Sequence, residues 1–394
     1  MPATPVVVAD VWVNAGAALE PPEWSGMAHF LEHMVFKGTE HLLPGMFDYA
    51  IETRGGMSNA ATSHDYAHFY MTLAADTLPE ALPYLAELVL HAAIPADEFV
   101  RERQVVLEEI RQAHDDPDWI GFQALSEQVF AGHAYGRPVL GTEAILQQRS
   151  PEEMRCFHQT HYQPDNMTVV ITGGIPIEST LEMVRHAFRV FAPQASCPQN
   201  QAQPIQPWWG VRRQVLQVPR LEHARLLMAW VGPGIDALDD ACGMDLLAVI
   251  LGEGRSARLV RELREERQWV LDVVTSFSLQ RDCSLFMIQA WLDPERVDAV
   301  EALICDRTAA LAAYPVPATE LKRAQRLLIN DFAFSTETPG QLAGLYGYYS
   351  VVSSPEASYA YPMRIRTHTP ASLAVLAKQY LSANAYASTV LLPG

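Results

Sequence analysis

The sequence predicts an α+β protein of two homologous domains, each a mostly antiparallel β-sheet packed with helices. The chain has 394 residues, 49% of them hydrophobic, so it can bury more than one core. A strand pattern followed by a helix pattern occurs in each half, and a proline-rich stretch without apolar periodicity separates them. We therefore expect an N-terminal domain over residues 1–192, a linker over 193–212 and a C-terminal domain over 213–394.

The first half alternates between strand and helix patterns. Residues 6–14 are rich in β-branched and aromatic types and predict a strand. Apolar residues that recur at helical or alternating spacing predict the elements that follow. In order, these are a helix over about 27–36, a hairpin over 55–73 and long helices over about 77–92 and 96–114.

The second half repeats this pattern in degraded form. Residues 226–232 resemble the first strand, and residues 243–250 resemble residues 26–33. Aligned on their Gly-Met pairs, His29 falls on Leu246, Glu32 on Val249 and His33 on Ile250. This pattern indicates a duplicated α+β unit in which only the first copy kept polar residues on this helix. Any metal chemistry is therefore expected in the first half.

His29 and His33 are four positions apart in a predicted helix, so they lie on one face, with Glu32 beside them. Neutral imidazoles suit zinc, and a catalytic zinc needs three protein ligands and an open position for water. The pair is incomplete until a third ligand is found. The alternative is an accidental pair on a surface helix.

A carboxylate-rich helix downstream offers the third ligand. At about 100° per residue, its buried stripe is formed by Phe99, Val106, Ile110 and Ala113. Glu109 lies at the edge of this stripe and Glu108 points away from it, so Glu109 is the better candidate. Glu102 lies on the same face, two turns or about 10 Å before Glu109, which is too far to bind the same ion. We assign Glu102 a supporting role in orienting a ligand histidine; the alternative is an exposed carboxylate paired with a neighbouring arginine.

Composition excludes several other classes. A net charge of −18 and a pI near 5.1 argue against nucleic acid or an anionic membrane as partner. The five cysteines are scattered and form no C-x-x-C pair, which indicates a reducing compartment. The first residues lack a basic signal-peptide region, and no apolar stretch is long enough to span a bilayer. From these features we expect a cytoplasmic protein.

The motifs together resemble one family over essentially the whole chain. His29-x-x-Glu32-His33 is the inverted zinc motif of the inverzincins. The run Glu102–Glu109 is similar to that of the pitrilysin, insulysin and mitochondrial processing peptidase family, as are Phe36–Thr39, Gly55–Thr62 and Tyr135–Pro138. The resemblance implies a zinc metalloendopeptidase of half-clamshell form. It also implies His29, His33 and Glu109 as zinc ligands and Glu32 as general base.

The resemblance also implies how substrate is held. In this family the edge strand that matches the hairpin pairs with an extended peptide, which makes Asn59 and Ala60 candidate substrate contacts. The alternative is a glycine-rich turn needed only for folding. Because only flexible segments can add a strand, we expect oligopeptides or unfolded segments as substrates.

The second half departs from the family at one position. Related sites are completed by an arginine and a tyrosine that bind the substrate; here Arg264 matches the arginine, but Leu271 replaces the tyrosine, and leucine cannot donate a hydrogen bond. Arg264 remains a substrate-binding candidate, although the interpretation that it only caps or salt-bridges a helix is favoured. We therefore expect a dimer, and specifically the zinc half of a heterodimer whose metal-free sister subunit carries the arginine and tyrosine.

Two further functions stay open. The first is a non-catalytic structural or assembly subunit, because some relatives keep the fold and lose the zinc; the presence of all four zinc-site residues argues against it. The second is a dedicated maturase of one peptide precursor. Family members usually carry another strand before residues 6–14, so a truncated start would weaken the argument for a cytoplasmic location.

Overall fold

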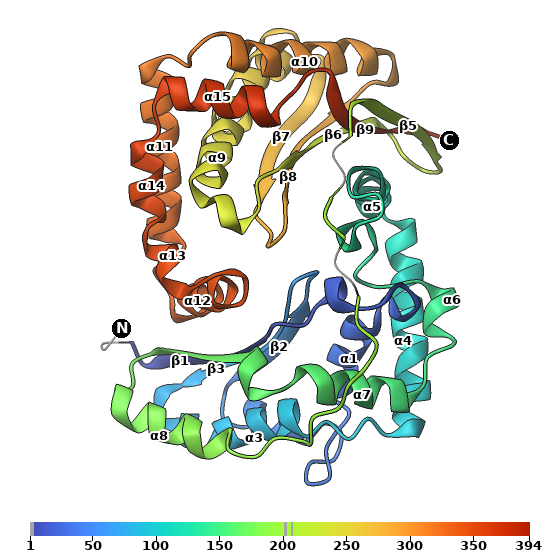
Figure 1. The fold of residues 1–394 in the computed structure, drawn as a ribbon, viewed down its shortest axis with the longest axis vertical. Helices are drawn as coiled ribbons and strands as arrows, with labels where there is room; N and C mark the ends of the chain where they lie inside the picture. Colours follow the sequence, from blue (N-terminus) through green and yellow to red (C-terminus); the bar gives the residue numbers. More distant parts are fainter. Residues whose placement is uncertain (1–3, 201–202, 206–207) are drawn as a thin grey trace. The chain divides into compact units, whose positions relative to one another are not determined.

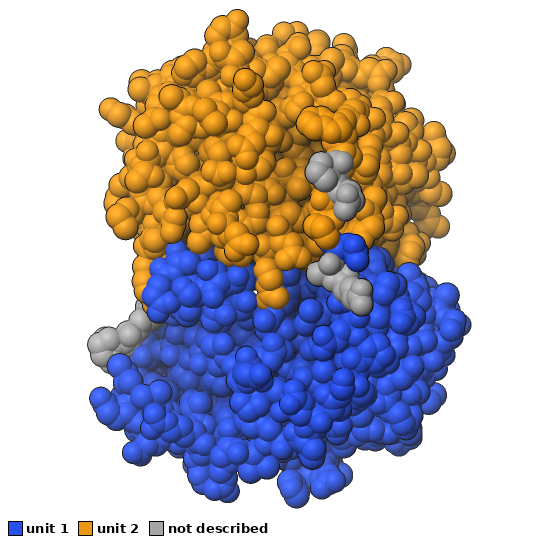
Figure 2. All heavy atoms as spheres, in the orientation of Figure 1, with its two compact units in different colours: residues 1–112, 137–203, 335–358 blue, residues 113–136, 204–334, 359–394 orange. Residues whose placement is uncertain are grey.

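The computed structural model describes residues 4–200, 203–205 and 208–394. Helices and strands alternate along the chain, and the strands form two β-sheets (Figure 1). The predicted α+β class is therefore confirmed. The chain divides into two compact units (Figure 2). The first unit comprises residues 1–112, 137–203 and 335–358, and the second comprises residues 113–136, 204–334 and 359–394.

The sheet of the first unit has four strands in the order β2-β3-β1-β4, and all its neighbours are antiparallel. The strands are β1 (Val6–Val13), β2 (Met57–Thr62), β3 (Ala67–Ala74) and β4 (Met167–Gly173). Alternation sorts the side chains of β3: Phe69 and Met71 enter the apolar core, whereas His68 and Tyr70 lie on the other face. In this order of the described strands, β2 has β3 as its single strand neighbour, so β2 is an edge strand.

Helices cover this sheet. They are α1 (Met27–Val35), α2 (Met46–Glu52), α3 (Leu78–Leu90), α4 (Ala96–Asp115), α6 (Glu143–Leu146), α7 (Pro151–His161), α8 (Ile177–Ala187) and α12 (Pro339–Val352). The core joins α1, α3, α4 and α7 to the sheet through large buried side chains, among them Phe30, Phe99 and Phe157. The predicted strand, hairpin and three helices of this region agree with these bounds to within a few residues.

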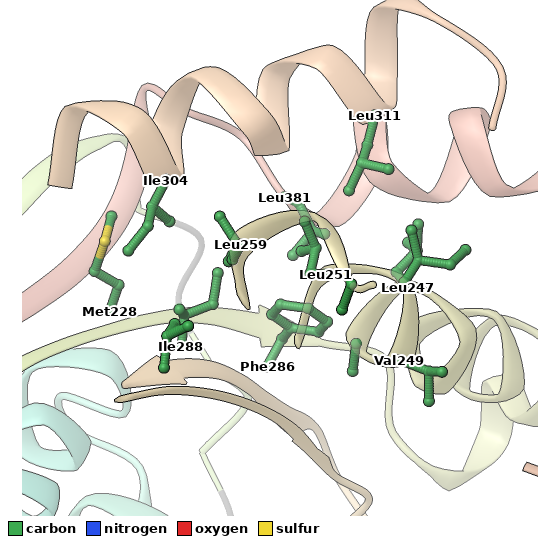
Figure 3. Packing of buried hydrophobic residues seen from close by; sticks show 14 of the residues in the cluster. Met228, Leu247, Val249, Leu251, Leu259, Phe286, Ile288, Ile304, Leu311 and Leu381 are labelled. Carbon is green, nitrogen blue, oxygen red and sulfur yellow. The ribbon is translucent and has the colours of Figure 1, made fainter. Parts of the chain in front are cut away.

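The second unit has a five-stranded sheet in the order β5-β9-β6-β8-β7, in which only β5 and β9 run parallel. Its strands are β5 (Gly210–Val218), β6 (Ala224–Gly232), β7 (Val270–Ser278), β8 (Ser284–Leu292) and β9 (Ala385–Pro393). Its main helices are α5 (Pro117–Val129), α9 (Leu238–Gly252), α10 (Val297–Ala313), α11 (Ala318–Phe334), α14 (Tyr361–Thr367) and α15 (Pro370–Tyr380). Phe286 and Ile288 of β8 pack with Leu247 of α9 and Ile304 of α10 in its core (Figure 3).

Two helices do not follow the predicted domain ranges 1–192 and 213–394. The helix α5 belongs to the second unit, where Gly121 packs against Leu227 and Leu391 of the sheet. The helix α12 belongs to the first unit, where Gly347 lies directly on Trp12 and the Thr172 hydroxyl donates to the carbonyl of Pro339 at 2.6 Å. Such close packing requires small residues on the helix, a feature that apolar periodicity does not reveal.

The predicted linker over 193–212 is only partly a linker. Cys197 is buried in the core of the first unit, and β5 already begins at Gly210. Among the described helices, none is both long and apolar enough to cross a membrane.

Candidate metal centre

The helix α1 presents three polar side chains from a largely apolar sequence. Met27, Phe30, Leu31 and Met34 are fully buried in the core of the first unit. His29 and His33 lie on the opposite side of the helix, one turn apart, with their rings 4.8 Å apart in an edge arrangement. The spacing of four residues therefore brings both imidazoles together as predicted from helical geometry.

Glu109 of α4 approaches both histidines. Its Oε2 atom lies 3.6 Å from Nε2 of His29 and 3.5 Å from Nε2 of His33. The ligand atoms of the three residues all lie within 4.8 Å of one another. Four-coordinate zinc, with bonds near 2 Å, separates its ligands by about 3.3 Å, so this donor set fits a zinc ion. Within the described part of the chain, this is the one group of histidine, cysteine and carboxylate side chains with such spacing.

The neighbouring carboxylates of α4 have separate surroundings. Glu108 is exposed and pairs with Arg111 at 3.3 Å. Glu102 is only 7% exposed, and its Oε1 atom lies 2.9 Å from Nδ1 of His33, while its Oε2 atom lies 2.7 Å from Nζ of Lys37. The structure thus differs from the alternative of an exposed Glu102 paired with an arginine. Because Glu102 engages Nδ1 of His33, the nitrogen that remains available to a metal ion is Nε2, which faces Glu109.

Local electrostatics set the protonation of the candidate ligands. Burial lowers the pKa of His29 to about 4, so its imidazole is neutral at pH 7. The hydrogen bond from His33 holds the pKa of Glu109 below its ordinary value. A neutral imidazole beside an ionised carboxylate is the form in which both groups bind a metal cation.

Glu32 lies beside this group on α1 and contacts a residue that sequence analysis did not single out as functional. The hydroxyl of Thr62, at the end of β2, donates to Oε2 of Glu32 at 2.5 Å. Burial raises the pKa of Glu32 above its ordinary value, and the hydrogen bond from Thr62 opposes this shift. The sequence placed Thr62 within the predicted hairpin over 55–73, but only the packing of α1 on β2 shows that it reaches Glu32.

The candidate substrate contacts occupy the edge strand. Asn59 and Ala60 pair with Tyr70 and Phe69 of β3, so their side chains face opposite sides of the sheet. The side-chain Oδ1 atom of Asn59 accepts from the backbone N–H of Ala60 at 2.9 Å. The side-chain amide of Asn59 thus covers the backbone N–H of Ala60. An added strand that pairs with this N–H would have to displace the amide.

The remaining candidate, Arg264, belongs to the second unit. It lies in a short π-helical segment, η7 (Val260–Glu266), where its guanidinium contacts Glu265 at 2.9 Å and Asp272 at 2.8 Å. These ion pairs agree with the favoured interpretation of a structural arginine. Leu271, in the position of the family's tyrosine, is 58% exposed on β7.

The second copy of the zinc-site helix, α9, is apolar at the three positions that align with the zinc motif. Leu246, Val249 and Ile250, which align with His29, Glu32 and His33, are all buried in α9. These three positions therefore offer no metal ligand in the second copy.

Comparison with known proteins gives consistent results. Residues 1–143 match the family described as insulinase (peptidase family M16), and residues 149–328 match the peptidase M16 inactive domain. An uncharacterized zinc protease of Streptomyces coelicolor is 29% identical over 345 residues, which cover 86% of this chain and 74% of that protein. The zinc protease PqqE of Helicobacter pylori is 27% identical over 353 residues, which cover 88% of this chain and 79% of that protein.

Solved structures agree at the level of the fold. The crystal structure of a protease from Helicobacter pylori superposes with a TM-score of 0.93 at 25% identity, covering 99% of this chain and 94% of that one. A peptidase M16 inactive domain from Pseudomonas fluorescens gives a TM-score of 0.88 at 18% identity, covering 100% and 94% of the two chains. Since two family descriptions span both halves and the resemblance predicted from the motifs is confirmed, the chain belongs to the insulinase family of peptidases, family M16.

Proposed function

We propose that this chain is a zinc-dependent endopeptidase that hydrolyses oligopeptides or unfolded peptide segments. One observation carries the proposal: His29, His33 and Glu109 direct their ligand atoms at one point, with Glu32 beside them. Relatives that are named zinc proteases support the same activity.

The three ligands leave room for a water molecule and substrate. Glu109 has a side chain that is 42% exposed, and His33 is 23% exposed, so one side of the group is accessible. A bound zinc ion supplies a water of lowered pKa and polarises the carbonyl of the scissile bond. His29, His33 and Glu109 would hold the ion, and Glu102 would hold His33 in the correct tautomer.

Glu32 is suited to the role of general base. Thr62 engages its Oε2 atom, so Oε1 is the oxygen placed to accept a proton from the attacking water. Burial raises the pKa of Glu32 toward the range in which a carboxylate both accepts and returns a proton. Glu32 would then deliver this proton to the leaving amine, and no covalent enzyme intermediate is required.

The edge strand β2 supports an extended peptide as substrate. Its outer edge has no strand neighbour among the described residues, and it ends at Thr62, which contacts Glu32. A peptide that pairs with β2 would therefore lie beside the candidate zinc ligands, with Asn59 and Ala60 in contact with it. Main-chain pairing of this kind recognises extended backbone more than side chains.

We also propose that the chain acts as a dimer, with a metal-free sister subunit supplying the arginine and tyrosine pair. The support is local: Leu271 cannot donate a hydrogen bond, and Arg264 is already engaged by Glu265 and Asp272. Full peptidase activity of the purified chain alone, unchanged by added partner, would contradict the heterodimer. Activity that appears only on mixing would support it.

The decisive experiment combines metal analysis with peptide hydrolysis. We expect the wild-type protein to bind one zinc ion and to cleave an unstructured peptide, alone or with its partner. The Glu32→Gln variant should bind the same amount of zinc and lose cleavage. Zinc well below one equivalent after metal loading would reject the enzyme in favour of a structural or assembly subunit. Cleavage of a single precursor sequence among many would identify a dedicated maturase.

A further inference from the structure

Glu20 is a carboxylate enclosed in the protein interior, outside the motifs assigned above. It lies between two short 3-10 turns, η1 (Ala17–Leu19) and η2 (Pro22–Trp24), and has 0% exposure. A carboxylate in such a place is costly unless its oxygens are satisfied. Its partners therefore indicate what it does.

Both oxygens of Glu20 bind the start of α1. Oε2 accepts from the backbone N–H of Gly26 at 2.8 Å, and Oε1 accepts from the backbone N–H of Ala28 at 2.6 Å. Gly26 is the N-cap of this helix and has no side chain to satisfy the first N–H groups. Glu20 thus performs the capping function from a position outside the helix.

A second contact fixes the same turn from another side. Gly26 has φ of +93°, and a Cβ atom there would lie 2.7 Å from the carbonyl oxygen of Leu140. Arg137, at the start of the same loop, donates to the carbonyl of Glu20 at 2.7 Å and to that of Ala17 at 3.2 Å. The loop over residues 137–141 and Glu20 together hold the first turn of α1 in one place.

The two candidate histidine ligands depend on this turn to different degrees. The ring of His33 is oriented by Glu102 through Nδ1. The Nδ1 atom of His29 is buried and has no hydrogen-bond partner among the described residues. Because no hydrogen bond to Nδ1 holds its ring, the direction of His29 depends more strongly on the backbone of α1, and Ala28 is the residue directly before it.

We infer that Glu20 is a positioning residue for the metal centre. By holding the backbone of α1 through Gly26 and Ala28, Glu20 compensates for the hydrogen-bond partner that Nδ1 of His29 lacks. It fixes the first turn of α1 so that Nε2 of His29 meets Glu109. The inference rests on the proposed zinc site and adds a residue that touches neither metal nor substrate.

The test compares Glu20→Gln with Glu23→Gln, the same substitution at an exposed residue three positions away. A glutamine keeps one acceptor oxygen but places an NH₂ group against the other N–H. We expect Glu20→Gln to bind zinc about tenfold or more weakly in competition with a chromogenic chelator. We also expect a changed visible spectrum of its cobalt form and, at saturating zinc, a lower kcat with KM unchanged. Glu23→Gln should match the wild type in each measurement.

A purely structural role predicts a different result. In that case Glu20→Gln would lower the Tm of the metal-free and zinc-loaded proteins equally, and its zinc affinity and cobalt spectrum would match the wild type; this would overturn the inference. Glu20→Asp, which keeps the carboxylate but shortens it by one methylene, serves as the second variant if Glu20→Gln does not fold, and the same outcomes decide. A wild-type protein that binds zinc without cleaving peptides would reject the peptidase while leaving this inference intact.

Discussion

The carboxylate of Glu102 lies 2.9 Å from Nδ1 of His33. The ring nitrogen of this candidate zinc ligand that does not face Glu109 is thus held by a buried acceptor. The same carboxylate contacts Lys37 at 2.7 Å, which offsets its charge. His33 is therefore oriented before any ion arrives. Such preorganisation lowers the free-energy cost of forming the site.

Removal of this acceptor should weaken zinc binding. We expect Glu102→Gln to reduce zinc affinity by about 10–100-fold. Glutamine has only one acceptor oxygen, so its NH₂ group must face either Nδ1–H of His33 or Nζ of Lys37, both of which are donors. The measurement is competition with a chelator of known affinity. The control is Glu108→Gln on the same helix, whose side chain is exposed and pairs with Arg111. Equal zinc affinities in the two variants would show that Glu102 does not support zinc binding by His33.

Replacement of the general base should separate binding from catalysis. We expect Glu32→Gln to retain zinc at the wild-type stoichiometry and to lose about 100-fold or more in kcat, since glutamine cannot accept the proton of the attacking water. Peptide hydrolysis and metal analysis on the same sample provide the measurement. His29→Ala should lose both zinc and activity. A Glu32→Gln variant with substantial turnover would contradict the assigned role.

Backbone pairing at β2 should appear in the choice of substrate. Peptides that are N-methylated at amides facing β2 should show a raised KM, because each methyl group removes a donor and blocks the approach of the edge strand. Methylation at the intervening amides, which face away, provides the matched control. Equal effects of methylation at both sets of positions would argue against strand addition.

We expect the buried His158 to make the free energy of unfolding sensitive to acid. It is 3% exposed, its Nε2–H donates to the carbonyl of Val89 at 2.8 Å, and burial lowers its pKa to about 4. An unfolded histidine titrates near pH 6.5, so between these values the unfolded state binds the proton and the native state does not. This contribution is complete above about pH 6.5 and is lost as pH falls toward 4, at up to about 1.4 kcal/mol per pH unit.

The check is urea unfolding of the metal-free protein at pH 7 and pH 5. His158→Gln keeps a donor for Val89 but does not titrate, so its free energy of unfolding should fall less between the two pH values than that of the wild type. His186→Gln, at an exposed position of α8, should behave as the wild type does. An identical fall in all three proteins would show that His158 contributes nothing to the pH dependence.

Much of the first unit could be predicted from local sequence patterns. The strand β1, the hairpin β2–β3 and the helices α1, α3 and α4 follow from apolar periodicity, which depends on residues a few positions apart. The choice of Glu109 over Glu108 follows from helical phase in the same way, and the structure directs Glu109 at the two histidines. The roles of Asn59, Ala60 and Arg264 remain predictions.

The sequence by itself determined the family, the duplicated α+β class and the residues able to bind zinc, because short-range spacing encodes helix faces and strand alternation. Only the tertiary structure decided that Glu102 holds His33, that Thr62 reaches Glu32 and that Glu20 caps α1. It also decided the exchange of α5 and α12 between the units. These features are contacts between residues or elements that the chain separates, and their formation depends on how apolar faces and small residues pack, which local spacing does not record.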